Sequence, residues 1–192
     1  MSDLFANSSI DQNLESPLAD KMRPQSLDEV IGQHHLLGEG APLQNMVSSG
    51  NFSSIILWGP PGVGKTTIAR LLADHSKSHF EQLSAIFTGV SDLKKVFEAA
   101  KIRRTNGHKT IIFVDEIHRF NKSQQDSFLP FLEDGTITLI GATTENPSFE
   151  LNSSILSRVQ VLVLERLTNT NLENLFDRAE SLLGSQINLD LD

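Results

Sequence analysis

The sequence has no cysteine among its 192 residues, and it has no long apolar run. Without cysteine, disulfide bonds and cysteine-ligated zinc sites are excluded, and a reducing compartment such as the cytosol fits. The longest apolar runs, residues 55–58, 111–114 and 161–164, have the length of strands and are far too short to cross a bilayer. The first residues carry neither a basic nor a long apolar segment, so no signal peptide is visible. We therefore expect no membrane association.

Positive charge is also scarce, with 16 basic against 24 acidic residues and a net charge of -8. A protein that coats nucleic acid regardless of sequence needs a basic face, so the overall composition argues against that class. Half of the basic residues nevertheless fall within residues 94–122. This stretch is either a solvated surface or a local surface for a nucleic-acid backbone, and both interpretations stay open. The side chains that would face DNA are Lys101, Arg103, Arg104, Arg119 and Lys122.

The pattern of apolar residues predicts one α/β core. At 39% hydrophobic residues the chain has an ordinary globular composition and enough length for one substantial core. Residues 1–20 are polar and aperiodic, and we expect a flexible tail there. Strands are predicted at 54–58, 81–86, 110–115, 136–142 and 159–164. Helices are predicted at 41–49, 66–75, 91–104 (with Ser91 as N-cap), 122–133 and 171–183. Alternation of strands and helices predicts a parallel sheet covered on both faces.

The strongest local motif lies between the first predicted strand and the helix after it. Residues 59–66 read Gly-Pro-Pro-Gly-Val-Gly-Lys-Thr and fit the phosphate-binding pattern G-x-x-x-x-G-K-[ST]. In a strand–loop–helix arrangement, backbone N–H groups and the positive end of the helix bind phosphate oxygens. Lys65 is predicted to reach the β- and γ-phosphates, and the Thr66 hydroxyl to bind Mg²⁺. The predicted nucleotide contacts in this motif are Gly59, Pro60, Pro61, Gly62, Val63, Gly64, Lys65, Thr66 and Thr67.

Carboxylates and hydroxyls follow the later strands. Asp115 and Glu116 end the apolar run at 111–114. Asp115 is predicted to bind the Mg²⁺ shell, and Glu116 to polarise the water that attacks the γ-phosphate. The hydroxyls of Thr143 and Thr144 end the next strand, and we expect one of them to contact that phosphate and so report the bound nucleotide; ordinary turn chemistry is the alternative. Arg158, taken alone, reads as a surface residue.

Longer stretches carry a resemblance to a known family. Residues 118–126 and 141–149, with matching segments at 17–24 and 31–33, closely resemble the replication-associated recombination protein A family, AAA+ ATPases of the clamp-loader clade. The similarity covers roughly residues 17–180. It implies a P-loop NTPase core over 21–167, with a three-layer α/β/α fold and a five-stranded parallel sheet of order 5-1-4-3-2. It also implies that 168–192 begin a helical lid, in the amino-terminal ATPase portion of a longer protein.

The same resemblance implies roles for single residues. Adenine is expected beside Val30 and Ile31, and Thr144 is expected to act as the sensor, with Thr143 as the alternative register. Arg158 is expected to act in trans as an arginine finger on a neighbouring subunit. Many AAA+ proteins restrain the catalytic acid with an asparagine at the end of the second strand. The equivalent residue here is Ser84, so coupling of DNA to hydrolysis is expected to use other residues.

The implied activity is hydrolysis of ATP with Mg²⁺, weak in this chain alone. The implied partners are DNA (stalled forks, ends and single-stranded gaps), other copies of the chain in a homo-oligomer, commonly a tetramer, and single-stranded DNA-binding protein with other replication proteins. The implied location is the bacterial cytoplasm. Three alternatives stay open: a clamp-loader subunit, a Holliday-junction branch-migration motor, and a scaffold that binds nucleotide without hydrolysing it.

Overall fold

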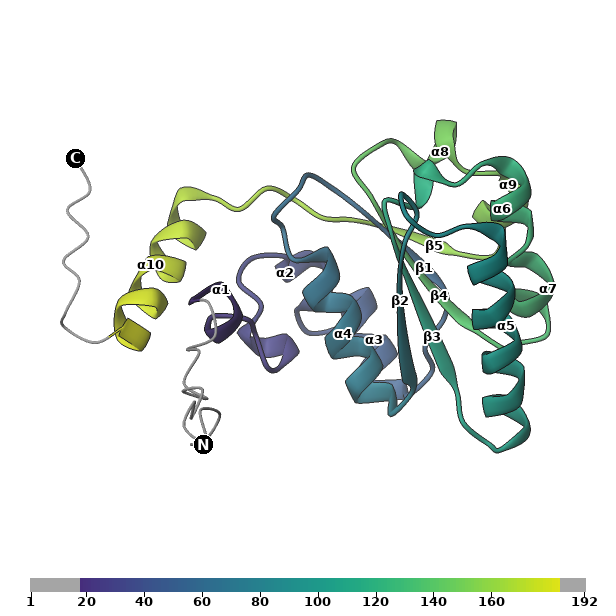
Figure 1. The fold of residues 1–192 in the computed structure, drawn as a ribbon. Coiled ribbons are helices and arrows are strands. Elements are labelled where there is room, and N and C mark those ends of the chain that lie inside the picture. The colour runs from purple at the N-terminus through teal and green to yellow at the C-terminus, as the bar shows by residue number, and fades with distance from the viewer. Residues whose placement is uncertain (1–17, 184–192) are drawn as a thin grey trace, which may run out of the picture.

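The computed structural model describes residues 18–183, and its centre is a five-stranded sheet between two layers of helices (Figure 1). Neighbouring strands are parallel and lie in the order β2-β3-β4-β1-β5. Read from the other edge, this is the predicted order 5-1-4-3-2, which is therefore confirmed. The strands are β1 (Ile55–Trp58), β2 (His79–Ser84), β3 (Thr110–Asp115), β4 (Thr138–Thr143) and β5 (Gln160–Val163).

Helices cover both faces of the sheet, as the alternating pattern predicted (Figure 1). Before β2 the chain forms α1 (Leu18–Lys21), η1 (Leu27–Glu29), α2 (His34–Leu37), α3 (Pro42–Ser49) and α4 (Lys65–Ser76). Between β2 and β5 it forms α5 (Val90–Thr105), η2 (Ile117–Arg119), α6 (Lys122–Asp126), α7 (Leu129–Glu133), α8 (Pro147–Glu150) and α9 (Ser153–Leu156). The last helix is α10 (Asn169–Leu183).

Strand β3 shows why the sheet has a core on each side. Ile111 and Phe113 pack with α4 and its neighbours, whereas Ile112 and Val114 pack with α5 and α7. Side chains of a strand alternate between faces, so a strand that is covered on both sides needs apolar residues at every position. This burial explains the uninterrupted apolar run that marked β3 in the sequence.

Two predicted helices differ from the observed ones. The helix expected at 122–133 is divided into α6 and α7, because Pro130 has no N–H with which to continue a helix that begins at Lys122. The predicted N-cap Ser91 is wrong. Helix α5 begins at Val90 with Gly89 as its N-cap, and the Gly89 N–H donates to Asp92 at 3.2 Å.

The ends of two strands also differ from the prediction. Strand β2 ends at Ser84 instead of residue 86, because Ile86 and Phe87 leave the sheet with exposed side chains. Strand β4 extends one residue further than predicted, to Thr143, whose neighbour across the sheet is Trp58. This extra residue places the Thr143 side chain in the interior at the end of the strand.

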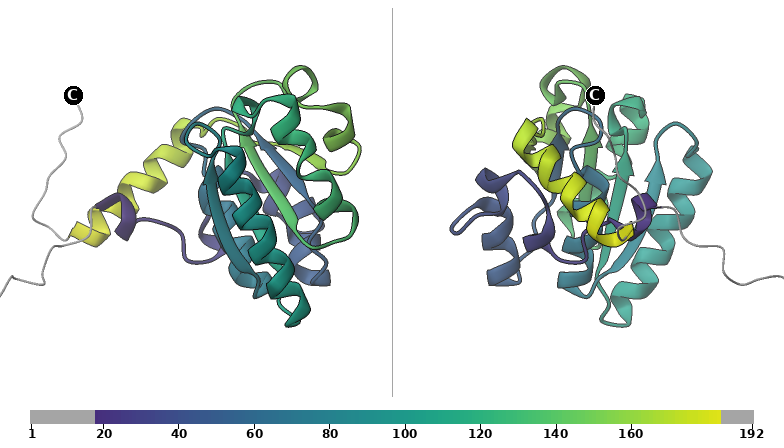
Figure 2. Two further views of the ribbon diagram at one scale, coloured as in Figure 1. Left: turned by 45° about the vertical axis from the view of Figure 1, so that its right-hand side comes forward. Right: turned by 90° about the vertical axis from the view of Figure 1, so that its left-hand side faces the viewer.

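The two end segments are described only in part. The tail predicted for residues 1–20 falls outside the described residues except for the start of α1, and residues 184–192 of the predicted lid region fall outside as well. Helix α10 extends away from the sheet on the side where α1 lies (Figure 2). Within residues 18–183, no helix combines the length and apolar character needed to cross a membrane.

Candidate nucleotide site

The loop between β1 and α4 has a backbone that depends on glycine. Gly62 and Gly64 adopt φ angles of +80° and +96°, in the left-handed region that glycine enters without steric cost. At Gly59, an added Cβ would lie only 2.6 Å from the carbonyl oxygen of Leu164. Helix α4 begins directly after this loop, at Lys65, so its amino terminus faces the loop. The loop therefore has the backbone form that binds phosphate at the positive end of a helix.

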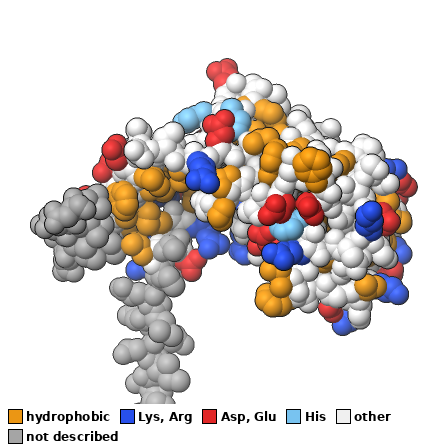
Figure 3. Space-filling view, turned by 90° about the horizontal axis from the view of Figure 1, so that it is seen from above, with side chains coloured by type: hydrophobic (Ala, Val, Ile, Leu, Met, Phe, Trp, Pro, Cys, Tyr) orange, Lys and Arg blue, Asp and Glu red, His pale blue; other side chains and the backbone are white. Residues whose placement is uncertain are grey.

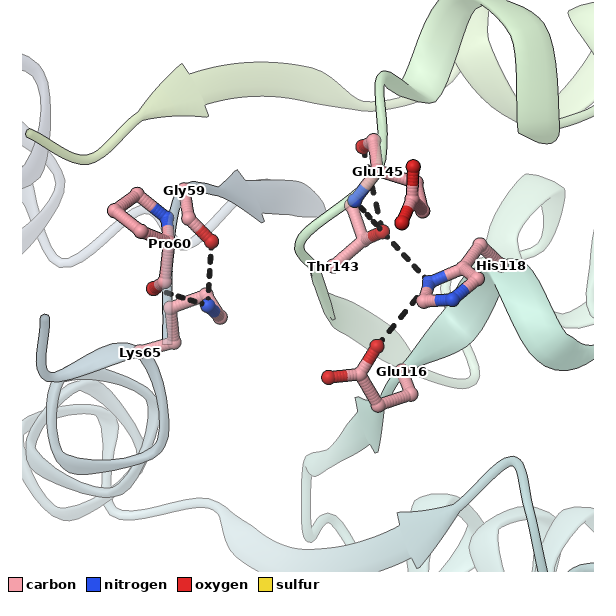
Figure 4. Close-up of polar contacts among 7 residues, drawn as sticks. All are labelled: Gly59, Pro60, Lys65, Glu116, His118, Thr143 and Glu145. Atoms are coloured by element: carbon pink, nitrogen blue, oxygen red, sulfur yellow. Dashed lines mark hydrogen bonds and ion pairs between the residues drawn. The ribbon is translucent and has the colours of Figure 1, made fainter. Parts of the chain in front are cut away.

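Lys65 is held inside this loop. Its side chain is only 9% exposed, and Nζ donates to the carbonyl oxygens of Gly59 at 2.7 Å and Pro60 at 2.8 Å (Figure 4). Burial lowers the pKa of Lys65, while the carboxylates of Glu116 and Asp115 act in the opposite direction. A buried lysine that faces two carboxylates in a hollow of the surface is typical of a functional site.

Asp115 and Glu116 leave β3 in an unusual way. Asp115 is the last strand residue, and Glu116 has φ 53° and ψ 45°, the left-handed conformation that costs a residue with a side chain about 1 kcal/mol. The direction of the Glu116 side chain is therefore set by this turn and not by the alternation of the strand. Strained backbone at a predicted catalytic residue fits a functional constraint.

His118 joins Glu116 to the end of β4. Its Nδ1 lies 2.8 Å from Thr143 Oγ1 and 3.3 Å from Glu116 Oε2 (Figure 4). The sequence favoured Thr144 as the sensor, with Thr143 as the alternative. Thr143 is the one whose hydroxyl takes part in this network, whereas Thr144 is half-buried and follows the end of the strand. The sensor role of Thr144 stays a prediction.

A cavity of about 700 Å³ gathers these groups. This size is typical of pockets that bind small molecules. Its lining includes Val30 and Ile31, the residues expected beside adenine, together with the loop and both carboxylates. The complete lining is Met22, Arg23, Pro24, Val30, Ile31, Pro61, Gly62, Val63, Gly64, Lys65, Thr66, Thr67, Asp115, Glu116, Leu167 and Leu175. Of the predicted loop contacts, Gly59 and Pro60 accept hydrogen bonds from Lys65 instead of lining the cavity.

Sequence reasoning missed part of this lining. Met22, Arg23, Pro24, Leu167 and Leu175 come from the two ends of the described chain, and no local pattern marks them as neighbours. The buried side chain of Gln33 explains why these two end segments lie side by side. Its side chain donates to the Glu165 carbonyl oxygen at 2.8 Å and accepts from the Glu165 N–H at 3.0 Å. This pair of bonds ties the segment of Val30 and Ile31 to the chain that follows β5.

The predicted Mg²⁺ ligands lie in the same cavity. Thr66 and Asp115 both line it, one from the first turn of α4 and the other from the end of β3. A hydroxyl and a carboxylate are the oxygen donors that Mg²⁺ prefers when it is also bound to phosphate. The donor set therefore fits the ion. Seen from above, acidic, basic and histidine side chains gather on this face of the molecule among uncharged ones (Figure 3).

Arg158 lies at the amino-terminal ends of the strands, opposite the carboxyl ends where the cavity is found. It precedes β5, whereas the phosphate loop follows β1, and these two strands are parallel. Its guanidinium forms an ion pair with Glu133 and donates to the Ser154 carbonyl oxygen at 2.7 Å. The side chain is therefore placed away from the cavity of its own chain.

The basic stretch is divided by the fold. The end of α5 lies at the edge of the sheet where β3 begins, and Arg119 and Lys122 follow the end of β3. Near the end of α5 the cations have acidic partners: Lys101 with Glu98 at 2.9 Å, Arg103 with Glu81 at 3.4 Å, and Arg104 with Asp134 at 3.2 Å. Within the described part of the chain, the exposed side chains of Arg119 and Lys122 have no hydrogen bond or ion pair. The five residues therefore do not form one surface.

Comparison with known proteins agrees with a nucleotide site in this cavity. Residues 55–167 match the profile of the ATPase family associated with various cellular activities (AAA). Replication-associated recombination protein A of Escherichia coli K12 is 51% identical over 177 residues, which cover 91% of this chain and 40% of the relative. ATPase WRNIP1 of Dictyostelium discoideum is 50% identical over 163 residues, which cover 85% of this chain and 19% of the relative.

Solved structures also resemble this fold. The RuvB Holliday junction branch migration motor of Thermotoga maritima matches with a TM-score of 0.68 and 31% identity, over 84% of this chain and 55% of that one. Among the relatives compared by sequence, the chain spans about 40% of the length of the E. coli protein.

Proposed function

Because the chain belongs to the AAA family of ATPases and is 51% identical to replication-associated recombination protein A of E. coli, we propose that it binds and hydrolyses ATP in replication-associated recombination. One observation carries this proposal. A single cavity brings the phosphate loop together with the carboxylates of Asp115 and Glu116. The family resemblance noted in the sequence is to this same recombination protein.

The residues of the cavity divide the work. The loop N–H groups and Lys65 bind the phosphates, and Val30 and Ile31 contact the adenine. Thr66 and Asp115 hold Mg²⁺, which when bound neutralises charge on the β- and γ-phosphates. Glu116 accepts a proton from the attacking water, because it is the remaining carboxylate in the cavity.

A second copy of the chain completes the site. Arg158 lies at the amino-terminal end of β5, whereas the phosphate loop follows the carboxyl end of β1. This separation supports action on the site of a neighbouring subunit instead of its own. Such arginine fingers raise the rate of hydrolysis by about 10³–10⁵. We therefore propose a homo-oligomer, a tetramer by family resemblance, whose hydrolysis rate per subunit rises with protein concentration.

DNA is the proposed macromolecular partner. The names of the E. coli relative and of the RuvB motor connect those proteins with recombination and with Holliday junctions. In this chain the exposed Arg119 and Lys122 are better candidates for phosphate contacts than the residues near the end of α5, because they have no acidic partner in the described structure. We assign the protein to stalled forks, DNA ends and single-stranded gaps in the bacterial cytoplasm.

A branch-migration motor is the second candidate, and the likeness to RuvB favours it. The two functions are separated by comparing branch migration of a four-way junction with binding to a model fork. A scaffold that binds ATP without hydrolysing it is disfavoured by the presence of Glu116 in the cavity.

The decisive experiment is Glu116→Gln in the whole protein. Glutamine keeps the size of the side chain but cannot accept the proton, so ATP should still bind while the rate of hydrolysis falls about 10²-fold or more. Steady-state hydrolysis at the wild-type rate would overturn the proposal. A single-turnover measurement on the wild-type protein excludes or confirms the scaffold.

A further inference from the structure

His118 has a position that the proposed chemistry has not yet used. It lies on η2, just after Glu116, and its side chain is 10% exposed. Its Nδ1 faces two oxygens, Thr143 Oγ1 at 2.8 Å and Glu116 Oε2 at 3.3 Å (Figure 4). The imidazole therefore connects the turn after β3 with the end of β4.

The groups around Thr143 and Glu116 are compatible with a proton on Nδ1 of His118. The Glu145 N–H donates to Thr143 Oγ1 at 3.1 Å, and the Thr143 hydroxyl can donate to the Glu145 carbonyl oxygen at 3.4 Å. A carboxylate accepts hydrogen bonds and cannot donate them. Nδ1 must therefore carry a proton if it is to bind Glu116, and the same N–H is shared with Thr143 Oγ1. In this arrangement every donor of the network has an acceptor.

The anchor of this network is rigid. Thr143 is fully buried, and its carbonyl oxygen accepts a hydrogen bond from the Gly59 N–H at 3.1 Å. Gly59 is the first residue of the phosphate loop. Two hydrogen bonds thus connect the loop through Thr143 to His118, and the 3.3 Å ion-pair contact of Nδ1 with Glu116 Oε2 extends this connection to the carboxylate. A side chain that is held in this way costs less entropy to orient during the reaction.

Glu116 is held by one oxygen only. Oε2 contacts His118, and among the described residues Oε1 has no hydrogen-bond partner. Figure 4 shows the carboxylate between His118 and the side of the cavity where Lys65 lies. A general base needs one oxygen free to accept a proton, and a hold on the other oxygen fixes its direction.

The residue that the family pattern would assign to this task does not take it. Ser84 ends β2 and is paired in register with Asp115, and no hydrogen bond joins its side chain to Glu116 in the described structure. We propose that His118 is the positioning residue that orients the Glu116 carboxylate, and that Thr143 anchors it. This inference rests on the proposed ATP hydrolysis.

Two substitutions in the whole protein test the role of the N–H group. His118→Phe keeps a ring but removes the donor, whereas His118→Asn can place an amide N–H near the position of Nδ1. We expect His118→Phe to lower kcat about tenfold to a hundredfold, the range for a partner that orients a functional group. KM and the affinity for ATP should stay within about twofold, because His118 does not line the cavity. His118→Asn should recover most of the lost kcat.

A double-mutant cycle tests the anchor. Thr143→Val removes the hydroxyl while keeping the shape of the side chain, and it should lower kcat in the wild-type background. In the His118→Phe background the same change should have little further effect, because the two groups act as one unit. Additive losses would show that Thr143 does not work through His118.

A readout independent of activity is the tautomer of the ring. Nitrogen NMR of the wild-type protein should show Nδ1 protonated and Nε2 unprotonated. The inference is overturned by the opposite tautomer, by wild-type kcat in His118→Phe, or by equal losses in His118→Phe and His118→Asn. If Glu116→Gln abolishes hydrolysis but His118→Phe keeps the wild-type kcat, this inference fails and the proposed function stands. If Glu116→Gln hydrolyses ATP at the wild-type rate, the proposed function itself fails.

Discussion

Arg178 in α10 forms an ion pair at 2.6 Å with Glu29, a residue that lies 149 positions earlier in the chain. Glu29 is next to Val30 and Ile31 in sequence, and Leu175, one turn before Arg178, lines the same cavity as these two residues. The ion pair therefore fastens α10 over the part of the cavity where adenine is expected.

This ion pair should make the docking of α10 depend on pH. The hydrogen bond from Arg178 lowers the pKa of Glu29 from its ordinary value of 4.5. A carboxyl group whose pKa is lower in the folded state stabilises that state above the unfolded pKa and stops doing so as the pH falls through the folded one. We expect the hydrogen-exchange protection factors of α10 to fall below about pH 4.5.

The matched control is Glu29→Gln, which cannot titrate. Its α10 amides should be less protected at neutral pH and should show no additional loss in the acidic range. Amides of α5 provide an internal reference for general acid unfolding. The same pH dependence in both proteins would contradict a docking role for Glu29.

Lys65→Met should separate folding from nucleotide binding. Burial lowers the pKa of Lys65, so the folded protein pays to keep this charge, and an apolar side chain of similar length removes that cost. A thermal shift assay should therefore show a folded protein. Wild type should gain about 2.7 kcal/mol from ATP at a hundred times its Kd. Lys65→Met should gain almost nothing at that concentration. Lys94→Met changes an exposed lysine of α5 and should behave as wild type.

The divided basic stretch predicts two different responses to DNA. Arg119→Ala with Lys122→Ala should flatten the dependence of log K on log salt, by about 0.7 for each lost contact to single-stranded DNA. Lys101→Ala with Arg104→Ala should leave that slope unchanged, because these side chains are paired with Glu98 and Asp134. Fluorescence anisotropy with one oligonucleotide at several salt concentrations measures both. If only Lys101→Ala with Arg104→Ala flattens the salt dependence, the DNA-binding surface lies near the end of α5 instead.

Glu133→Gln should release Arg158 for work on a neighbouring subunit. The ion pair is partly exposed, so its loss should change the free energy of unfolding by less than about 1 kcal/mol. Turnover at low protein concentration should rise, because less energy is needed to free the guanidinium. Arg158→Ala should instead lower turnover about 10³-fold. If Glu133→Gln loses activity as Arg158→Ala does, then Glu133 orients the arginine instead of restraining it.

Features that are contiguous in the chain could be predicted from the sequence. The phosphate loop and the carboxylates of Asp115 and Glu116 each occupy a few successive residues, and the buried strands show as apolar runs because both faces of the sheet are covered. The strand order, the choice of Thr144 over Thr143 and the role expected for Arg158 came only from family resemblance.

Some local details were beyond the sequence as well. The left-handed turn at Glu116 has no glycine to announce it, because the surrounding structure imposes this conformation on an ordinary residue. The division of the helix predicted at 122–133 was visible in principle, since Pro130 lacks the N–H that a continuous helix needs.

By itself, the sequence determined that this chain has a phosphate loop, a pair of catalytic-type carboxylates and a sheet to carry them. Only the tertiary structure decided what surrounds them. Leu175 and Met22 meet at one cavity, His118 reaches Thr143, and Arg158 is separated from Lys65 by the length of the strands. The physical reason is that strand order and direction decide which residues are neighbours, and neither depends on separation along the chain.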